Sequence, residues 1–263
     1  MNIDTLRVFE AFAGYGSQSM ALERLRKSHP GFDYQVVGIS EIDMNAVAAY
    51  NAIHHPIPPN YGDITQIEWD KVPDFDLLTY SFPCQDLSMS GLQKGFEEGS
   101  GTRSSLLWHI RKAVIAKRPK YLLMENVRAL TFKKNMPLFA KWQDELVSYG
   151  YTNYWQVLNA TDFNVPQNRQ RVFMISILND EEGFTFPKPQ ELTKTISDVL
   201  EENVDECYYL NQSVVNKYLE VTADTRHNHN LGLRKRSDIA YTIRTKSGGR
   251  VDDNYIANVE EIK

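Results

Sequence analysis

Short apolar runs alternate along the first 180 residues with segments in which apolar positions recur at helical spacing. The runs predict strands buried on both faces, and they cover residues 6–12, 34–40, 75–82, 120–127 and 171–178. Segments whose apolar positions repeat about every 3.6 residues predict helices at 17–28, 43–55, 105–118 and 136–150. This alternation is typical of βαβ units, so we expect an α/β fold with a mostly parallel sheet. Ligands of such sheets bind beyond the carboxyl ends of the strands.

The pattern changes after residue 180. Residues 181–225 are polar, acidic and punctuated by proline, and they predict a linker followed by a short helix. Between Arg226 and Arg250 the charge reverses, because Arg234, Lys235, Arg236, Arg244, Lys246 and Arg250 accompany a single acid, Asp238. We therefore expect a domain at 1–180, a linker at 181–225 and a separate basic region at 226–263.

Composition narrows the class of protein. The 263 residues are 42% hydrophobic and 24% charged, as in ordinary globular proteins, and no apolar stretch approaches the ~20 residues of a membrane helix. The formal net charge of −5 argues against a protein that coats nucleic acid without specificity, although a local basic face remains compatible with it. Two cysteines form neither a disulfide framework nor a metal-ligand spacing, so we expect a cytoplasmic protein without a metal.

A glycine-containing turn follows the first predicted strand. Gly14 and Gly16 permit a tight turn with close approach of a ligand, although a plain strand–helix turn has the same pattern. Glu41 follows the second strand, where a carboxylate can accept both hydroxyls of a ribose. Asp63, expected at a third strand end, is placed to hold an adenine amino group. Because a pyrophosphate fingerprint is absent, this order fits S-adenosylmethionine better than a dinucleotide.

The stretch "LLTYSFPCQDLSMSG" (77–91) places Cys84 just beyond a buried strand. A structural thiol would be expected inside the apolar run. A lone cysteine after a strand is most often inert, so its position alone does not identify a nucleophile. Cys207 in "DECYYL" has no such neighbours and is interpreted as structural.

Several motifs together resemble one family. "FAGYGS", "SEID", "GDI", "SFPCQDLSMSG", "MENV" and "VPQNRQRVFMI" resemble, in order and spacing, the motifs of the cytosine-C5 DNA methyltransferases, over roughly residues 5–180. The resemblance implies a doubly wound sheet of the class I S-adenosylmethionine-dependent type and an incomplete second lobe. It also implies double-stranded DNA as substrate, in a restriction-modification or phage setting.

The resemblance assigns roles to individual residues. Cytosine C5 is a poor nucleophile, so a thiolate must first add at C6, which is the role implied for Cys84. Glu125 would meet N3, Arg171 would stabilise charge at O2, and Arg169 would support the site; the base must leave the duplex to reach this pocket. The implied cofactor-binding residues are Phe12, Ala13, Gly14, Gly16, Ser17, Glu41, Ile42, Asp63, Ile64, Phe82, Pro83 and Leu106. The implied DNA contacts are Gln85, Ser88, Ser90, Asn126, Val127 and Gln167.

The sequence also departs from the family pattern. Ser81 stands where the family usually has glycine before Phe-Pro-Cys, and we expect little effect of this exchange. The last family motifs are not found in their usual place. We therefore expect part of a split enzyme, a truncated product or a chain with its C-terminal segment removed, and a second chain that supplies those motifs.

Two other functions stay open. A tRNA cytosine-C5 methyltransferase would use the same chemistry. A non-catalytic cofactor-binding or DNA-binding partner would not need Cys84, Glu125 and Arg171 together.

Overall fold

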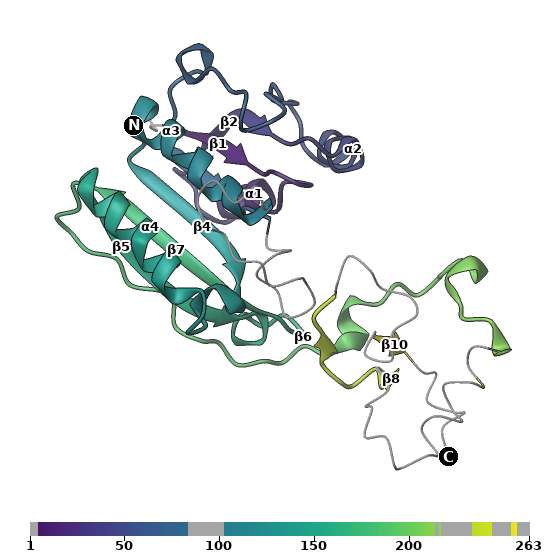
Figure 1. The fold of residues 1–263 in the computed structure, drawn as a ribbon. Helices are drawn as coiled ribbons and strands as arrows, with labels where there is room; N and C mark the ends of the chain where they lie inside the picture. Colours follow the sequence, from purple (N-terminus) through teal and green to yellow (C-terminus); the bar gives the residue numbers. More distant parts are fainter. Residues whose placement is uncertain (1–4, 84–102, 214–215, 217–232, 244–253, 257–263) are drawn as a thin grey trace. The chain divides into compact units, whose positions relative to one another are not determined.

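The structure is a computed structural model that describes residues 5–83, 103–213, 216, 233–243 and 254–256 (Figure 1). Contacts within the chain divide it into two units. The first unit comprises Met1–Val157 and Arg171–Phe186, and the second comprises Leu158–Gln170 and Pro187–Lys263. The division expected near residues 180 and 225 stays a prediction.

A six-stranded sheet forms the centre of the first unit, in the order β2-β1-β3-β4-β7-β5. Its strands are β1 (Leu6–Ala11), β2 (Tyr34–Ser40), β3 (Leu77–Tyr80), β4 (Tyr121–Val127), β5 (Tyr151–Asn159) and β7 (Gln170–Leu178). β1 pairs in parallel with β2 and β3, and β3 pairs in parallel with β4. The predicted mixed α/β fold with a mostly parallel sheet is therefore confirmed.

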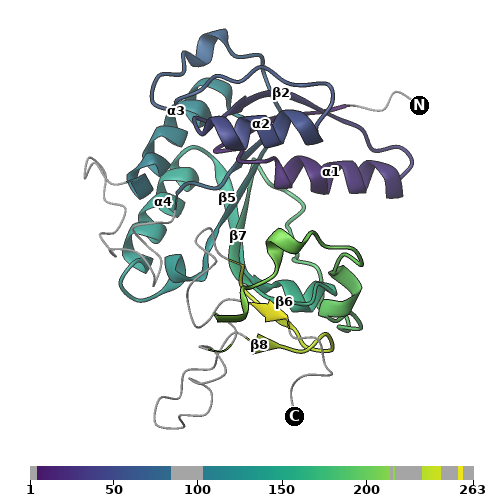
Figure 2. The same cartoon turned by 90° about the vertical axis from the view of Figure 1, so that its right-hand side faces the viewer.

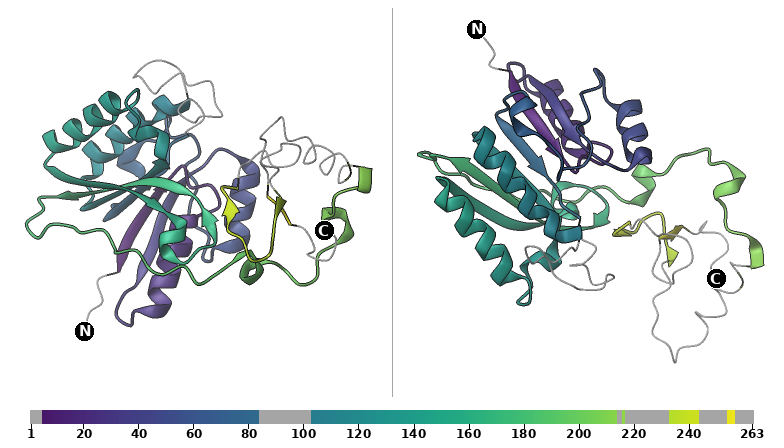
Figure 3. Two further views of the ribbon diagram at one scale, coloured as in Figure 1. Left: turned by 90° about the horizontal axis from the view of Figure 1, so that it is seen from below. Right: turned by 45° about the horizontal axis from the view of Figure 1, so that its top comes forward.

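Helices cover both faces of this sheet. They are α1 (Ser17–Ser28), α2 (Met44–Ile53), α3 (Leu107–Lys117) and α4 (Met136–Ser148). The view along the sheet edge shows α3 and α4 on one face, with α1 and α2 on the other (Figures 2 and 3). Short 3₁₀ segments connect them at Trp69–Lys71, Arg103–Leu106 and Arg128–Thr131. All four predicted helices are present, each within a few residues of its expected bounds.

The main hydrophobic core lies between the sheet and helices α3 and α4. Its members include Phe9, Leu78, Leu122, Met124, Val172 and Met174 from the strands and Leu107, Ile110, Phe139, Trp142 and Leu146 from the helices. The face covered by α1 and α2 has a smaller cluster, formed by Ala13, Ile39 and Tyr50. The sheet is therefore packed on both faces, which leaves its strand ends as the accessible edges.

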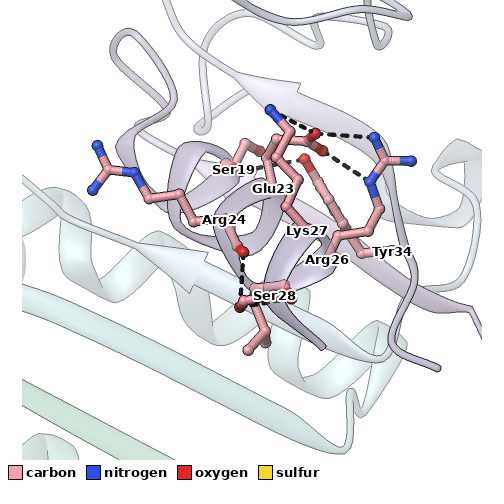
Figure 4. A network of polar contacts seen from close by, with 8 residues as sticks. Ser19, Glu23, Arg24, Arg26, Lys27, Ser28 and Tyr34 are labelled. Atoms are coloured by element: carbon pink, nitrogen blue, oxygen red, sulfur yellow. Dashed lines mark hydrogen bonds and ion pairs between the residues drawn. The ribbon is translucent and has the colours of Figure 1, made fainter. Parts of the chain in front are cut away.

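Helix α1 is anchored to β2 by a tyrosine and is charged on its outer side (Figure 4). The Tyr34 hydroxyl donates to the Ser19 carbonyl oxygen at 3.2 Å. On the exposed side, the Glu23 carboxylate accepts from Arg26 Nε at 2.9 Å and lies 3.4 Å from Lys27 Nζ. Such exposed pairs contribute about 0–1 kcal/mol each, so the buried contacts of the helix dominate its stability.

The second unit contains only short strands among its described residues. β6 (Gln167–Asn168) pairs in parallel with β9 (Ala240–Tyr241), and β8 (Leu233–Arg234) with β10 (Tyr255–Ile256). The 3₁₀ segments are Ala160–Phe163, Ile196–Val199 and Glu206–Tyr208. Backbone hydrogen bonds join Ile196 and Ser197 to Asp238 and Arg236, which attaches the linker to the basic region.

Candidate active site

The turn after β1 has the backbone conformation that its glycines predict. Gly14 (φ 58°) and Gly16 (φ 80°) both lie in the left-handed region that favours glycine. A Cβ at Gly16 would lie 2.6 Å from Tyr50 Cε2, whereas a Cβ at Gly14 would meet nothing within 4 Å. Gly16 is therefore required by packing, while Gly14 leaves open space above the turn. The neighbouring Phe12 is half-buried at φ 57°, Ala13 is buried and Ser17 is exposed.

The Glu41 carboxylate joins the end of β2 to this turn. Its Oε2 accepts from the Gly14 backbone N–H at 2.8 Å, and its Oε1 accepts from Ile42 N at 2.9 Å and Asp43 N at 2.8 Å. A carboxylate has about four acceptor positions, so these three bonds leave one, on Oε2. Ile42 beside it is 69% exposed. The end of β2 thus offers a ligand one carboxylate acceptor and one exposed apolar side chain.

Three backbone donors of the turn are already used. Ala13 N–H donates to the Ser40 carbonyl oxygen at 3.2 Å, Gly14 N–H to Glu41, and Gly16 N–H to the Ala13 carbonyl oxygen at 2.9 Å. A pyrophosphate needs a row of free N–H groups, which these residues do not offer, and it would lie beside a carboxylate. A sulfonium cofactor with a ribose needs an acceptor and open space instead. The turn therefore fits S-adenosylmethionine.

Asp63 lies in a turn, contrary to its expected position at a strand end. The chain makes only an isolated bridge from Ile39 to Asn60 before reaching it. The exposed Asp63 carboxylate accepts from Thr65 N–H at 2.9 Å, which stabilises the turn itself. Ile64 is 3% exposed and belongs to the main core, against which the half-buried Leu106 also packs.

The segment that leads toward Cys84 is attached to β4 by an asparagine. Phe82 is 2% exposed and Pro83 is half-buried. Asn126, also 2% exposed, donates from Nδ2 to the Phe82 carbonyl oxygen at 3.0 Å and accepts from Val127 N–H at 2.9 Å. Both ends of this amide are therefore bonded to backbone. The half-buried Val127 is the last residue of β4.

Glu125 and Arg171 form an ion pair across β4 and β7. Arg171 Nε lies 3.0 Å from Glu125 Oε1, with side-chain exposures of 17% and 23% respectively. In the antiparallel register Val127 faces Arg171 and Glu125 faces Phe173, so both charged residues lie on one face of the sheet. Asn126 between them points to the other face. Two residues far apart in the sequence thus form one charged group near the carboxyl end of β4.

A buried polar group beneath the turn has no counterpart among the predicted site residues. Glu10 in β1 is 1% exposed and accepts from Ser19 N–H (3.0 Å), Ser19 Oγ (2.7 Å) and the Tyr50 hydroxyl (2.6 Å). Burial raises the pKa of Glu10, and the hydrogen bonds from Tyr50 and Ser19 act against this rise. His54 packs on Tyr50 and bonds through Nε2 to the Tyr15 carbonyl oxygen at 3.0 Å. This network connects β1, α1 and α2 and so holds the turn after β1, which we call the cofactor turn, in place.

The remaining predicted residues lie outside the described residues or in the second unit. Cys84, Gln85, Ser88 and Ser90 lie outside the described residues. Gln167 and Arg169 belong to the second unit, where Arg169 N–H donates to Asn159 Oδ1 at 2.9 Å. Cys207 is exposed. In the described part of the chain no group of three His, Cys, Asp or Glu side chains is arranged to bind a metal, and no helix is long and apolar enough to span a membrane.

Comparison with known sequences identifies the family. The sequence model described as "C-5 cytosine-specific DNA methylase" matches residues 6–261. The type II methyltransferase M2.ScrFI of Lactococcus lactis subsp. cremoris is 44% identical over 80% of this chain and 71% of its own length. The orphan methyltransferase M.SssI of Spiroplasma monobiae is 36% identical over 95% of this chain and 78% of its own length.

Solved structures agree with the fold. S. pombe Dnmt2 methyltransferase superimposes with a TM-score of 0.65 at 23% identity, over 89% of this chain and 69% of that one. The Entamoeba histolytica methyltransferase EhMeth gives a TM-score of 0.70 at 17% identity, over 90% and 70%. Family and fold both support S-adenosylmethionine as the cofactor. On the sequence match and these relatives, the chain belongs to the family of C-5 cytosine-specific DNA methylases.

Proposed function

We propose that this protein methylates C5 of cytosine in double-stranded DNA through a covalent bond between Cys84 and C6. The observation that carries the proposal is the ion pair at 3.0 Å between Glu125 of β4 and Arg171 of β7, because Asn126 of the same β4 holds the segment leading to Cys84. Glu125, Arg171 and the last described residues before Cys84, Phe82 and Pro83, thereby belong to the first unit.

The chemistry gives each residue a distinct task. The Cys84 thiolate adds to C6, which pushes electron density toward N3 and O2 and makes C5 nucleophilic. Glu125 donates a proton or hydrogen bond at N3, and Arg171 holds the Glu125 carboxyl in place and stabilises charge at O2. After methyl transfer, loss of the C5 proton restores the ring and releases Cys84.

The cofactor site lies at the turn after β1. When bound, S-adenosylmethionine supplies an electrophilic methyl group on a sulfonium. Gly14 leaves room for it, Glu41 accepts one ribose hydroxyl, and the exposed Ile42 covers the apolar face of the adenine. The sequence predicts further residues around the cofactor. These are Phe12, Ala13, Gly16, Ser17, Asp63, Ile64, Phe82, Pro83 and Leu106.

The target base must leave the duplex, because C6 of a stacked cytosine is inaccessible to a side chain of the protein. Asn126, which the sequence predicts to contact DNA, instead acts as a positioning residue in this scheme, since both ends of its amide are bonded to backbone. Arg169 supports the site, and Gln85, Ser88, Ser90, Val127 and Gln167 contact DNA. The second chain expected from the sequence stays a prediction.

Mechanism-based trapping tests the proposal directly. Duplex DNA with 5-fluorocytosine in place of cytosine forms a covalent adduct that does not resolve, because the C5 fluorine cannot leave as a proton does. We expect the purified protein with S-adenosylmethionine to give an adduct that survives denaturing electrophoresis, and Cys84→Ser to give none. Cys207→Ser, which changes the exposed second cysteine, should trap as the wild type does.

Three results would contradict the proposal. An adduct in Cys84→Ser would remove the assigned nucleophile. Trapping and methyl incorporation on transfer RNA, with none on duplex DNA, would support the tRNA methyltransferase alternative. No trapping on either substrate, with intact cofactor binding, would favour the non-catalytic alternative.

A further inference from the structure

The serine that replaces the usual family glycine has a bonding partner. Ser81 Oγ accepts a hydrogen bond from Gln18 Nε2 at 3.0 Å, and both side chains are half-buried. A glycine has no atom that could accept this bond. The sequence had suggested that this exchange has little effect, whereas the structure gives the hydroxyl a defined contact.

Gln18 reaches this bond from the cofactor turn. It lies in the first turn of α1, two residues after Gly16, and its Oε1 accepts from Ser17 Oγ at 2.9 Å. Ser17 and Gln18 thus form a short hydrogen-bonded chain that ends on Ser81. The register of β1 with β3, in which Ala11 faces Tyr80, brings the two strand exits side by side.

The exit of β3 is therefore attached on both sides. Gln18 holds it at Ser81, and Asn126 of β4 holds it one residue later, at the Phe82 carbonyl oxygen. Phe82 itself is buried in the main core. Cys84 follows Phe82 by two residues in the sequence, so these contacts hold the last described residues that precede it.

We infer that Gln18 is a positioning residue, and that its bond to Ser81 couples the cofactor turn to the segment carrying the nucleophile. This inference rests on the proposed function. Thiolate and methyl donor must meet neighbouring carbons of one pyrimidine ring, and reacting atoms must approach to roughly 3–3.5 Å. A bond between the two supporting segments reduces their relative displacement.

A double-mutant cycle tests this coupling. Gln18→Ala, Ser81→Ala and the double variant are compared in single-turnover methyl transfer to duplex DNA, with cofactor and DNA saturating. Each single change should slow methyl transfer by about three- to ten-fold, the range of one hydrogen bond, and the double change should be no slower than either. Cofactor affinity by calorimetry should change by less than about two-fold.

Two further variants separate positioning from a general loss of structure. Gln18→Glu keeps the acceptor for the Ser17 hydroxyl and replaces the donor at Ser81 by a second acceptor, to which the Ser81 hydroxyl can donate, so it should restore most of the rate. Gln143→Ala, which removes a half-buried glutamine side chain of α4 that donates to the Phe139 carbonyl oxygen of the same helix, should leave the rate unchanged.

The outcomes distinguish this inference from the proposed function. A wild-type protein that transfers no methyl group to DNA contradicts the proposed function. A wild type that transfers methyl groups, with single-variant effects that multiply in the double variant, contradicts the coupling alone. Ser81→Gly, which restores the family residue, supplies the same comparison if Gln18→Ala lowers the yield of folded protein, and its rate must then match that of Ser81→Ala.

Discussion

Replacing Glu41 by alanine should affect both the fold of the turn and the binding of cofactor. The carboxylate accepts three backbone N–H bonds, from Gly14, Ile42 and Asp43. One acceptor position remains, which is a lone pair of Oε2. Alanine removes all four, so two separate measurements are expected to change.

The stability effect follows from the three backbone bonds. A net hydrogen bond contributes about 0.5–1.5 kcal/mol, and water replaces much of this for the partly exposed donors at Ile42 and Asp43. We therefore expect Glu41→Ala to lower the free energy of unfolding by about 1–2 kcal/mol. This corresponds to a fall of about 2–8 °C in the unfolding midpoint of a chain of this size.

The affinity effect follows from the single remaining position. One charge-assisted hydrogen bond to a ribose hydroxyl is worth about 1.5–3 kcal/mol. Its loss should raise the dissociation constant roughly ten- to 150-fold. Isothermal titration calorimetry with S-adenosylmethionine measures it. Glu68→Ala is the control, because this exposed acid pairs only with Lys71 on its own 3₁₀ segment.

Thermal unfolding with and without cofactor separates the two effects. A lower midpoint without cofactor reports the turn, and a smaller upward shift on adding cofactor reports the ribose contact. If Glu41→Ala binds S-adenosylmethionine as the wild type does, the ribose contact assigned to this carboxylate is wrong. If its midpoint without cofactor is unchanged, the three backbone bonds contribute nothing measurable.

Three further predictions concern other residues. Glu125→Gln should slow methyl transfer by about 10²–10⁴-fold at unchanged cofactor affinity, and equal rates in a single-turnover assay would exclude it as the acid. Gly16→Ala should lower the free energy of unfolding by about 2–4 kcal/mol in a urea titration, because φ is 80° and Tyr50 Cε2 lies 2.6 Å from the new Cβ. Burial raises the pKa of Asp76, but hydrogen bonds and charge from Arg7 outweigh it and hold the pKa below its usual value. The stability from this half-exposed pair is present above the unfolded pKa and lost as pH falls through the folded one, so Arg7→Gln should cost about 0–1 kcal/mol at pH 7 and progressively less as the pH falls below the unfolded value of about 3.9.

Hydrophobic periodicity predicted most of the fold, and its failures have local causes. β5 was not predicted, because "YTNYWQVLN" alternates polar and apolar residues irregularly and contains only one fully buried residue. The antiparallel direction of β7 was not predicted either, because a buried strand has the same apolar pattern in either direction. Strand direction depends on the tertiary contacts of the segment.

The site was less predictable than the fold. Glu125 and Arg171 were identified individually, but their pairing depends on a register that the sequence does not specify. Glu10 was missed although its signal was visible, since a carboxylate inside the apolar run "LRVFEAF" must be compensated by nearby donors. Its partners, Ser19 and Tyr50, lie in two different helices, so spacing alone could not identify them.

The register between β4 and β7 also limits how this chain can change in length. Side chains alternate between faces, so one residue inserted or deleted within Gln170–Leu178 would turn Arg171 away from Glu125. A shift of two residues would restore the face but displace the guanidinium by about 7 Å along the strand, well beyond the reach of an ion pair. Variation in length at this place is therefore confined to the segment that enters β7, whereas substitutions within the strands leave the geometry of the pair intact.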